Sequence, residues 1–359
     1  MANFLMPVGH TMLDGNSDSH GTDEAPVDNA SGDVVLERRI TVGRGPIGDI
    51  AVAGADVVVT NVGADSVSIL DSAGRGVGGE VRLAGEPSAV VVTADRAYVA
   101  TGSASHDAVS VIDLDTRAVV ATFPVPFGIT ALAASPDGKR VYAGRTAHDR
   151  IDIMVIDVVS ERVGTIDVGY GPAACLDALR VDPSGKRLYA AVTDVGGSRL
   201  IVIDAETSRV QRVAAVGSPI RDIAYVGGSV YVLTSDRAVG GAVHVIDLAT
   251  DMETDRVELG GAPTQLVMSP DHSRAYIVDY DRVAVLCTLR LGVVDSLSVD
   301  ARPSCVASGA DGTQLYVADY SGAVNVFSVE STMETLYSQF LATDPIALSV
   351  PRSLQPVTV

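Results

Sequence analysis

Short apolar runs separated by turn-forming residues dominate the chain from Val34 onward. Val, Ile and Ala gather in runs of strand length, and Gly, Pro, Asp and Asn interrupt them. No stretch shows the three-to-four-residue spacing of an amphipathic helix. The pattern predicts an all-β chain of many short strands.

A repeat is visible when the apolar runs that end in a polar residue are aligned. Five runs end in Asp and two further copies end in Cys or Ser, at Asp71, Asp113, Asp157, Asp204, Asp247, Cys287 and Ser328. Successive copies are 40 to 47 residues apart. A period of this length is typical of a propeller blade.

Two more markers keep the same phase. A tyrosine lies inside a small apolar run in six copies, at Tyr98, Tyr142, Tyr189, Tyr231, Tyr276 and Tyr316, and Val58 takes its place in the first copy. A corner precedes each tyrosine, at Pro46, Pro87, Ile129, Pro172, Pro219, Pro263 and Pro303. Each copy therefore has room for four antiparallel strands, and seven copies predict a single seven-bladed β-propeller.

The tyrosine runs carry a family resemblance. Arg-Ala-Tyr-Val-Ala-Thr at 96–101 and Leu-Tyr-Val-Ala-Asp at 315–319, each followed by an apolar strand, resemble the YVTN repeat. The resemblance covers residues 34–332 and implies the propeller fold, but it does not select a function. The chain has no tryptophan, so it does not fit the WD40 repeat.

The two ends of the chain lie outside the repeat. Residues 1–33 form an acidic tail without Lys or Arg, for which we expect disorder, and residues 333–359 form a C-terminal extension. The segment Val35–Val42 precedes the first corner at the spacing of an outer strand. We expect it to close the last blade, beside a strand near 323–329, which removes an open sheet edge. Met333–Ala342 is the competing closing strand.

Charge and composition exclude several classes of protein. A formal net charge of −19 argues against a nucleic-acid partner. No apolar run is long enough for a transmembrane segment, and the first residues lack the pattern of a secretory signal. The three cysteines show no CxxC spacing for a metal site. We expect a monomer in the cytoplasm, with the cell envelope as the alternative location.

Polar residues recur three positions after the tyrosine marker, where the second strand of each copy ends. The residues that we single out there are Asn61, Arg145, Asp279 and Asp319. The repeat places them on one face, so we hypothesise that they border the opening of the central channel and bind a ligand. The side-chain oxygens of Asn61, Asp279 and Asp319 suggest a weaker alternative, a Ca²⁺ site. The alternative is that they only terminate strands by bonding to nearby backbone.

A second group of charges follows the corners, in the innermost strand. Most copies have Ala, Val or Leu there, whereas the fifth has Arg221 and Asp222, the first has Asp49 and the fourth adds Arg180. Charges near a central channel must be paired or hydrated. They are either structural pairs or part of a ligand-binding surface. His148, in the loop after the second strand of the third copy, is a further ligand-binding candidate.

These observations favour a non-catalytic binding or scaffold protein that engages a protein partner or a small ligand through this face. We identify no catalytic residues, no metal ligands and no required cofactor. The first alternative is a hydrolase or isomerase that is similar to the propeller lactonases and acts on a sugar lactone or a related small molecule. The second is a surface-layer-like envelope protein, which the YVTN resemblance implies.

Overall fold

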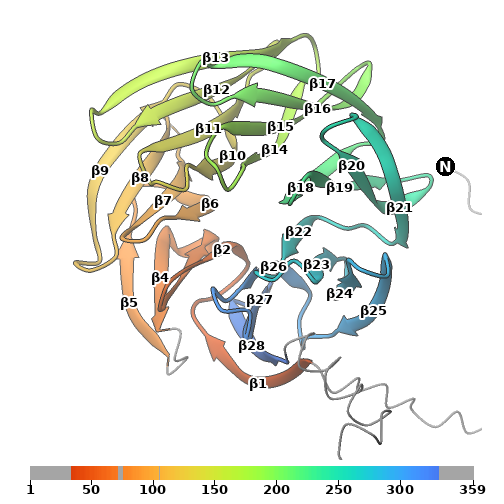
Figure 1. Cartoon of the computed structure of the whole chain (residues 1–359). Helices are drawn as coiled ribbons and strands as arrows, with labels where there is room; N and C mark the ends of the chain where they lie inside the picture. The colour runs from red at the N-terminus through yellow and green to blue at the C-terminus, as the bar shows by residue number, and fades with distance from the viewer. Residues whose placement is uncertain (1–33, 72–75, 105, 331–359) are drawn as a thin grey trace, which may run out of the picture. The chain divides into compact units, whose positions relative to one another are not determined.

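The computed structural model describes residues 34–71, 76–104 and 106–330, and these form seven four-stranded antiparallel sheets (Figure 1). The predicted all-β, seven-bladed propeller is therefore confirmed. The acidic tail (residues 1–33) and the C-terminal extension (residues 333–359) lie outside the described residues. The last described residue of the repeat is Glu330. Among the described residues, no helix has the length and apolar character to cross a membrane.

Each blade runs from an inner strand at the channel to an outer strand at the rim. Blades 1 to 4 consist of β2 (Ile47–Ala53), β3 (Asp56–Asn61), β4 (Ser66–Asp71) and β5 (Val77–Arg82); β6 (Glu86–Val92), β7 (Arg96–Gly102), β8 (Asp107–Asp113) and β9 (Ala118–Val125); β10 (Ile129–Ala134), β11 (Arg140–Thr146), β12 (Arg150–Asp157) and β13 (Arg162–Tyr170); and β14 (Cys175–Val181), β15 (Arg187–Asp194), β16 (Gly197–Asp204) and β17 (Arg209–Gly217).

The remaining blades follow the same order. Blades 5 to 7 consist of β18 (Ile220–Val226), β19 (Ser229–Asp236), β20 (Gly240–Asp247) and β21 (Met252–Gly260); β22 (Gln265–Met268), β23 (Arg274–Asp279), β24 (Arg282–Cys287) and β25 (Gly292–Leu297); and β26 (Pro303–Ser308), β27 (Gln314–Asp319), β28 (Ala323–Val329) and β1 (Val34–Thr41). A single 3₁₀ turn, Val62–Ala64, follows β3.

The ring closes through the two ends of the repeat. The inner strand β2 contacts both β6 and β26, so blade 1 packs against blade 2 and blade 7. The outer strand β1 pairs antiparallel with β28, with Val35 opposite Ser328 and Thr41 opposite Ala323. This confirms the predicted closing strand. The competing segment Met333–Ala342 lies outside the described residues.

The aspartate marker has a local cause. In four copies the carboxylate accepts the backbone N–H of the residue three positions later at 2.7–2.8 Å, namely Asp113 from Thr116, Asp157 from Ser160, Asp204 from Thr207 and Asp247 from Thr250. These bonds lower the pKa of all four carboxyls. The recurring Asp therefore fixes the turn from the third to the fourth strand.

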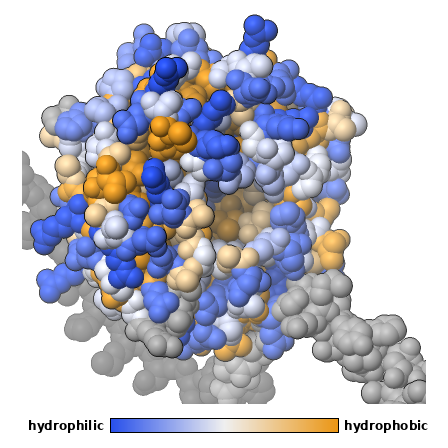
Figure 2. Space-filling model, turned by 60° about the vertical axis from the view of Figure 1, so that its left-hand side comes forward, coloured by the Kyte–Doolittle hydropathy of each residue, from blue (hydrophilic) through white to orange (hydrophobic). Residues whose placement is uncertain are grey.

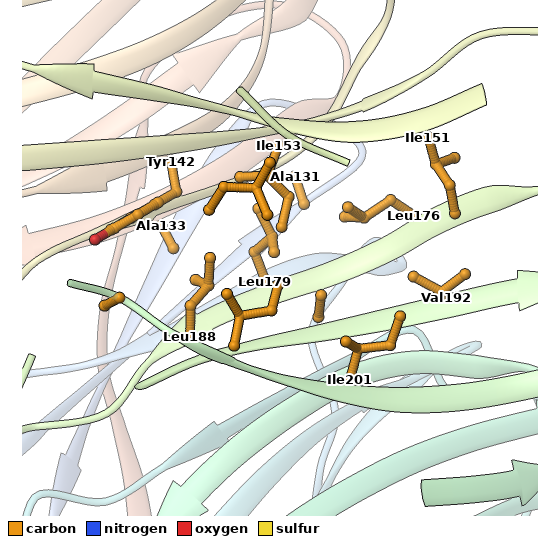
Figure 3. Close-up of a cluster of buried hydrophobic side chains, with 14 of the residues drawn as sticks. Ala131, Ala133, Tyr142, Ile151, Ile153, Leu176, Leu179, Leu188, Val192 and Ile201 are labelled. Carbon is orange, nitrogen blue, oxygen red and sulfur yellow. The ribbon is translucent and has the colours of Figure 1, made fainter. Parts of the chain in front are cut away.

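The tyrosine marker belongs to the seams, by which we mean the apolar clusters between neighbouring blades. Tyr142 of blade 3 is 1% exposed and shares a buried cluster with Leu179 and Leu188 of blade 4 (Figure 3). The other five tyrosines lie in equivalent clusters, and Val58 takes the place of the ring in the seam between blades 1 and 2. Each blade is thus held by apolar packing against the next.

Candidate functional site

The inner strands surround a central channel with a volume of about 580 Å³. Its wall is mostly Ala, Val, Ile and Leu, and Figure 2 shows a hollow with pale and apolar side chains inside a hydrophilic rim. The charged residues that line the channel are Asp49, Asp177, Arg180, Arg221 and Asp222. Four of these five come from blades 4 and 5, so the channel is polar on one side.

A β-bulge near the start of the inner strand places one extra residue at the channel wall in each of blades 3, 4 and 5. The register with the second strand shifts between Ile129 and Ala131, between Leu176 and Ala178, and between Ile220 and Asp222. The extra residue of a bulge is left unpaired. These residues are Thr130, Asp177 and Arg221, and all three line the channel. We call them the channel mouth.

Asp222 is a structural residue. Its carboxylate accepts the backbone N–H of Leu266 in blade 6 at 3.0 Å and that of Ile223 at 2.8 Å. The Arg180 guanidinium lies 2.8 Å from the same carboxylate. Burial raises the pKa of Asp222, while Arg180 and the two backbone donors oppose that shift. Asp222 therefore joins blade 5 to blade 6, as the structural alternative in the sequence analysis predicts.

Asp49 does the same work between blades 1 and 2. Its oxygens accept the N–H groups of Val90 and Ile50, both at 2.9 Å. Burial raises the pKa of this carboxyl to about 6, and the backbone bonds and Arg180 counteract the rise. In blade 6 the Gln265 amide oxygen accepts the N–H of Val306 at 2.7 Å. Polar side chains at this position thus link adjacent inner strands, which form no direct ladder with each other.

Arg221 differs from these linking residues. It is exposed in the channel, and within the described part of the chain its guanidinium makes no hydrogen bond and no ion pair. Its charge does act on the neighbouring Asp177, whose pKa it lowers against a larger rise that burial causes. The two residues lie on adjacent blades at corresponding bulges. Arg221 is thus a cation without a partner in the described structure, and it lies beside the half-buried carboxylate of Asp177.

The surroundings of Asp177 are well defined. The Thr193 hydroxyl donates to Asp177 Oδ2 at 2.5 Å and lies 2.8 Å from the Ser198 hydroxyl. Burial, followed by the charge of Asp177, raises the pKa of the Cys175 thiol to about 11. The thiol is therefore protonated at neutral pH and is a poor nucleophile. The Thr193 hydroxyl, which also contacts Ser198, thus orients the Asp177 carboxylate.

The residues that follow the tyrosine marker are mostly buried inside their blades and do not line the channel. Arg145 is 4% exposed, and its Nε donates to Asp152 Oδ1 on the next strand at 2.6 Å. Its guanidinium also stacks on the Phe127 ring at 4.4 Å. Asn61 donates to the hydroxyls of Ser66 and Ser68 at 3.2 and 2.9 Å. Both side chains thus bond within their own blade.

Asp279 and Asp319 are bound in the same way. Asp279 accepts backbone N–H groups from Ala262 and Tyr280 at 2.7 and 2.9 Å. Asp319 accepts from the Asn325 amide at 3.2 Å and lies 3.3 Å from Arg39. Within the described ranges, no three His, Cys, Asp or Glu side chains come together as a metal-binding group. Their geometry therefore gives no support to the Ca²⁺ hypothesis, and a direct role in ligand binding stays a prediction.

Two histidines of the described chain, His148 and His244, lie in different surroundings. His148 is exposed in the loop between β11 and β12. His244 lies between the Thr234 hydroxyl at 3.1 Å and the Glu253 carboxylate at 3.0 Å, an order that resembles a nucleophile relay. Thr234 is only 2% exposed and bonds to the Ala242 carbonyl, so its oxygen is closed to a substrate.

Sequence reasoning found part of this site. It named Arg221 and Asp222 and placed both in the channel, where both lie. It missed Asp177 and Thr130. The sequence did carry a signal for them. Each directly precedes an alanine, Ala131 or Ala178, and this alanine pairs with the residue two positions after the marker tyrosine. The longer connection around Pro172 hid this alignment in the fourth copy.

Comparisons with known proteins agree with the fold. No family model matches the chain. A seven-bladed beta-propeller protein of Mycolicibacterium smegmatis is 50% identical over 322 residues, which are 89% of this chain and 87% of that protein. The seven-bladed beta-propeller protein Rv1057 of Mycobacterium tuberculosis is 37% identical over 145 residues, which are 39% of this chain and only 35% of its own length.

One solved structure shows the fold alone. A chain of the Kuenenia stuttgartiensis hydrazine synthase superposes with a TM-score of 0.71 and 22% sequence identity, covering 82% of this chain and 97% of that one. Identity at this level carries no activity from one protein to the other. The match to the Mycolicibacterium smegmatis protein, which covers most of both chains, shows the family. The chain belongs to the family of bacterial seven-bladed β-propeller proteins that this relative represents.

Proposed function

We propose that this propeller is a non-catalytic binding protein that takes a small polar ligand at the mouth of its central channel. The observation that carries the proposal is Arg221, an exposed guanidinium at a bulge of β18 that has no hydrogen-bond or ion-pair partner among the described residues. Concave sites with an apolar wall and a few convergent polar groups are the usual form of small-molecule sites.

The contrast with Arg180 supports this reading. Arg180 lines the same channel and lies 2.8 Å from Asp222, so its charge is neutralised within the protein. Arg221 keeps its charge available in a chain of formal net charge −19. An arginine side chain presents a planar set of donors that matches a carboxylate or phosphate in two bonds. Because Arg221 has no partner in the described structure, we assign its charge to ligand recognition and not to stability.

The hydrolase alternative, which resembles the propeller lactonases, draws on one observation. Asp49 lies in the channel with its pKa raised to about 6, a value suited to a general acid or base near neutral pH. Both of its oxygens, however, accept backbone N–H groups that join two blades. We therefore favour binding over catalysis, and the YVTN resemblance adds nothing that separates the two.

Thermal-shift screening of small carboxylates, phosphates and amino acids, with calorimetry on the hits, tests the proposal. A ligand that binds only the folded protein must raise its melting temperature. We expect Arg221→Gln to abolish the response and Arg209→Gln, on the outer strand β17, to retain it. Equal responses in both variants would place the ligand elsewhere. Turnover of a sugar lactone that Asp49→Asn eliminates would favour the hydrolase instead.

A further inference from the structure

We infer that the channel mouth is built for a small zwitterion, of the kind that a free α-amino acid provides, with its carboxylate on Arg221 and its ammonium group on Asp177. This inference rests on the proposed function and names the class of its ligand. It follows from the way in which the two side chains are placed next to each other without pairing.

The two groups have opposite charges and corresponding positions. Arg221 and Asp177 are the bulged residues of β18 and β14, on neighbouring blades, and both line the channel. The charge of Arg221 acts on Asp177, yet no nitrogen of one lies within 4.0 Å of an oxygen of the other. By contrast, Arg180 and Asp222, also on blades 4 and 5, form a direct pair at 2.8 Å. Arg221 and Asp177 therefore form a separated pair of opposite charges, whereas Arg180 and Asp222 form a direct ion pair.

A ligand with one charge would leave half of this pair unused. An anion on Arg221 would approach the Asp177 carboxylate, and a cation on Asp177 would approach the Arg221 guanidinium. Like charges brought together in a partly desolvated site repel each other. A zwitterion places an attractive contact at each end, so it complements both groups at once.

Asp177 has capacity left for such a ligand. Its Oδ2 accepts the Thr193 hydroxyl at 2.5 Å. An ionised carboxylate offers about four acceptor positions, so about three remain. Burial penalises the charged form of Asp177, and an ammonium partner would offset that penalty. The residue is held in a fixed orientation and lacks only a cation of its own.

The wall beside the mouth sets the third contact. Ala131 and Ala178 follow the bulged residues in β10 and β14, and both line the channel. The side chain of each is a single methyl group. A ligand side chain directed down the channel would meet methyl groups, which favours an amino acid with an apolar side chain.

The test separates the two ends of the ligand. The full chain is titrated calorimetrically with L-leucine, N-acetyl-L-leucine, which keeps only the negative charge, and L-leucinamide, which keeps only the positive one. We expect L-leucine to bind at least about tenfold more tightly than either derivative, since each derivative loses one charge-assisted contact. Arg221→Gln should remove the preference for the free carboxylate, and Asp177→Asn the preference for the free ammonium group. Arg209→Gln should change neither.

The outcomes distinguish this inference from the proposed function. If N-acetyl-L-leucine binds as tightly as L-leucine and depends on Arg221, the mouth binds anions, so the inference is wrong and the proposed function stands. If L-leucine does not bind while another screened compound binds through Arg221, the zwitterion is again excluded. If no screened compound responds to Arg221→Gln, both statements fail. A folded, correctly melting Asp177→Asn variant with unchanged affinity for L-leucine would also overturn the inference.

Discussion

The packed interior of the ring and the channel mouth are built from the same repeat, yet their polar residues differ in how they are partnered. In the interior, Arg145 is paired with Asp152, and Asp319 is bonded by Asn325 and Arg39. At the mouth, Arg221 has no such partner in the described structure. The linking residues Asp49 and Asp222 lie between the two extremes, because they line the channel but bond to backbone.

This difference separates residues that hold the ring from residues that are free to act. A buried polar group must find a partner inside the protein, since leaving it unsatisfied costs free energy. A charge at the mouth can instead remain hydrated until a ligand replaces the water. The chemical type of a residue therefore does not identify a site in this fold. The absence of a partner within the described structure does, so substitutions of partnered residues should change stability and substitutions at the mouth should change ligand binding.

The largest effect is expected in the seams. Tyr142→Ala should reduce the free energy of unfolding by about 3–5 kcal/mol, because it removes a ring that is 1% exposed from the cluster between blades 3 and 4. Chemical denaturation measures the change. Tyr170→Ala is the control, since Tyr170 is 68% exposed. Equal costs in the two variants would contradict the role that we give to the seam.

The next effect concerns the buried ion pair. Arg145→Ala should cost about 3 kcal/mol of stability, because it leaves the Asp152 carboxylate, 0% exposed, without its main counter-charge. The double variant Arg145→Met/Asp152→Leu should recover most of that loss. A stable single variant that had lost ligand binding would instead assign Arg145 to the binding site.

A smaller effect follows from Asp49 and depends on pH. Its folded-state pKa of about 6 lies above the ordinary value of 3.8, so the folded protein favours the protonated form. The penalty for ionisation is absent below pH 3.8, grows as the pH rises, and is complete above pH 6. Relative to Asp49→Asn, the parent should therefore lose on the order of 2 kcal/mol between pH 4 and pH 7. Paired urea titrations at both values measure the difference, and a constant gap would refute the assignment.

The smallest effect on stability is expected at the mouth. Arg221→Gln should change the free energy of unfolding by no more than about 0.5 kcal/mol, as for an exposed residue without partners. The measurement is the same denaturation series used for Tyr142→Ala. A loss of more than about 1 kcal/mol would show that Arg221 supports the ring, and the distinction between seam and mouth would no longer hold for it.

The fold could be predicted from the sequence because its determinants are local and repeated. The Asp marker fixes a turn three residues away, and the tyrosine marker reports a position that is buried in every copy. The closing strand followed from spacing, and β1 pairs with β28 as expected. Seven repetitions made each weak signal strong.

The site could be predicted only in part because a one-residue bulge decides it. Arg221 and Asp222 are consecutive, and the sequence grouped them as one charged feature. The register shift of β18 turns Asp222 to the backbone of blade 6 and leaves Arg221 at the mouth. Likewise, the sequence did not reveal that Asn61 and Arg145 bond to partners on the next strand. Such partners depend on which residues lie opposite each other, which composition does not reveal.

The closing strand has a consequence for how the protein is made. β1 is the first of the described strands to leave the ribosome, and its partner Ser328 is 293 residues away in the chain from Val35. At ordinary translation rates, β1 waits about 15 to 60 s before β28 exists. During that time its edge is open, and Glu37, Arg38 and Arg39 within it discourage pairing with another chain. Closure of the ring thus joins the first and the last of the described strands, and the charges of β1 protect its open edge until β28 is synthesised.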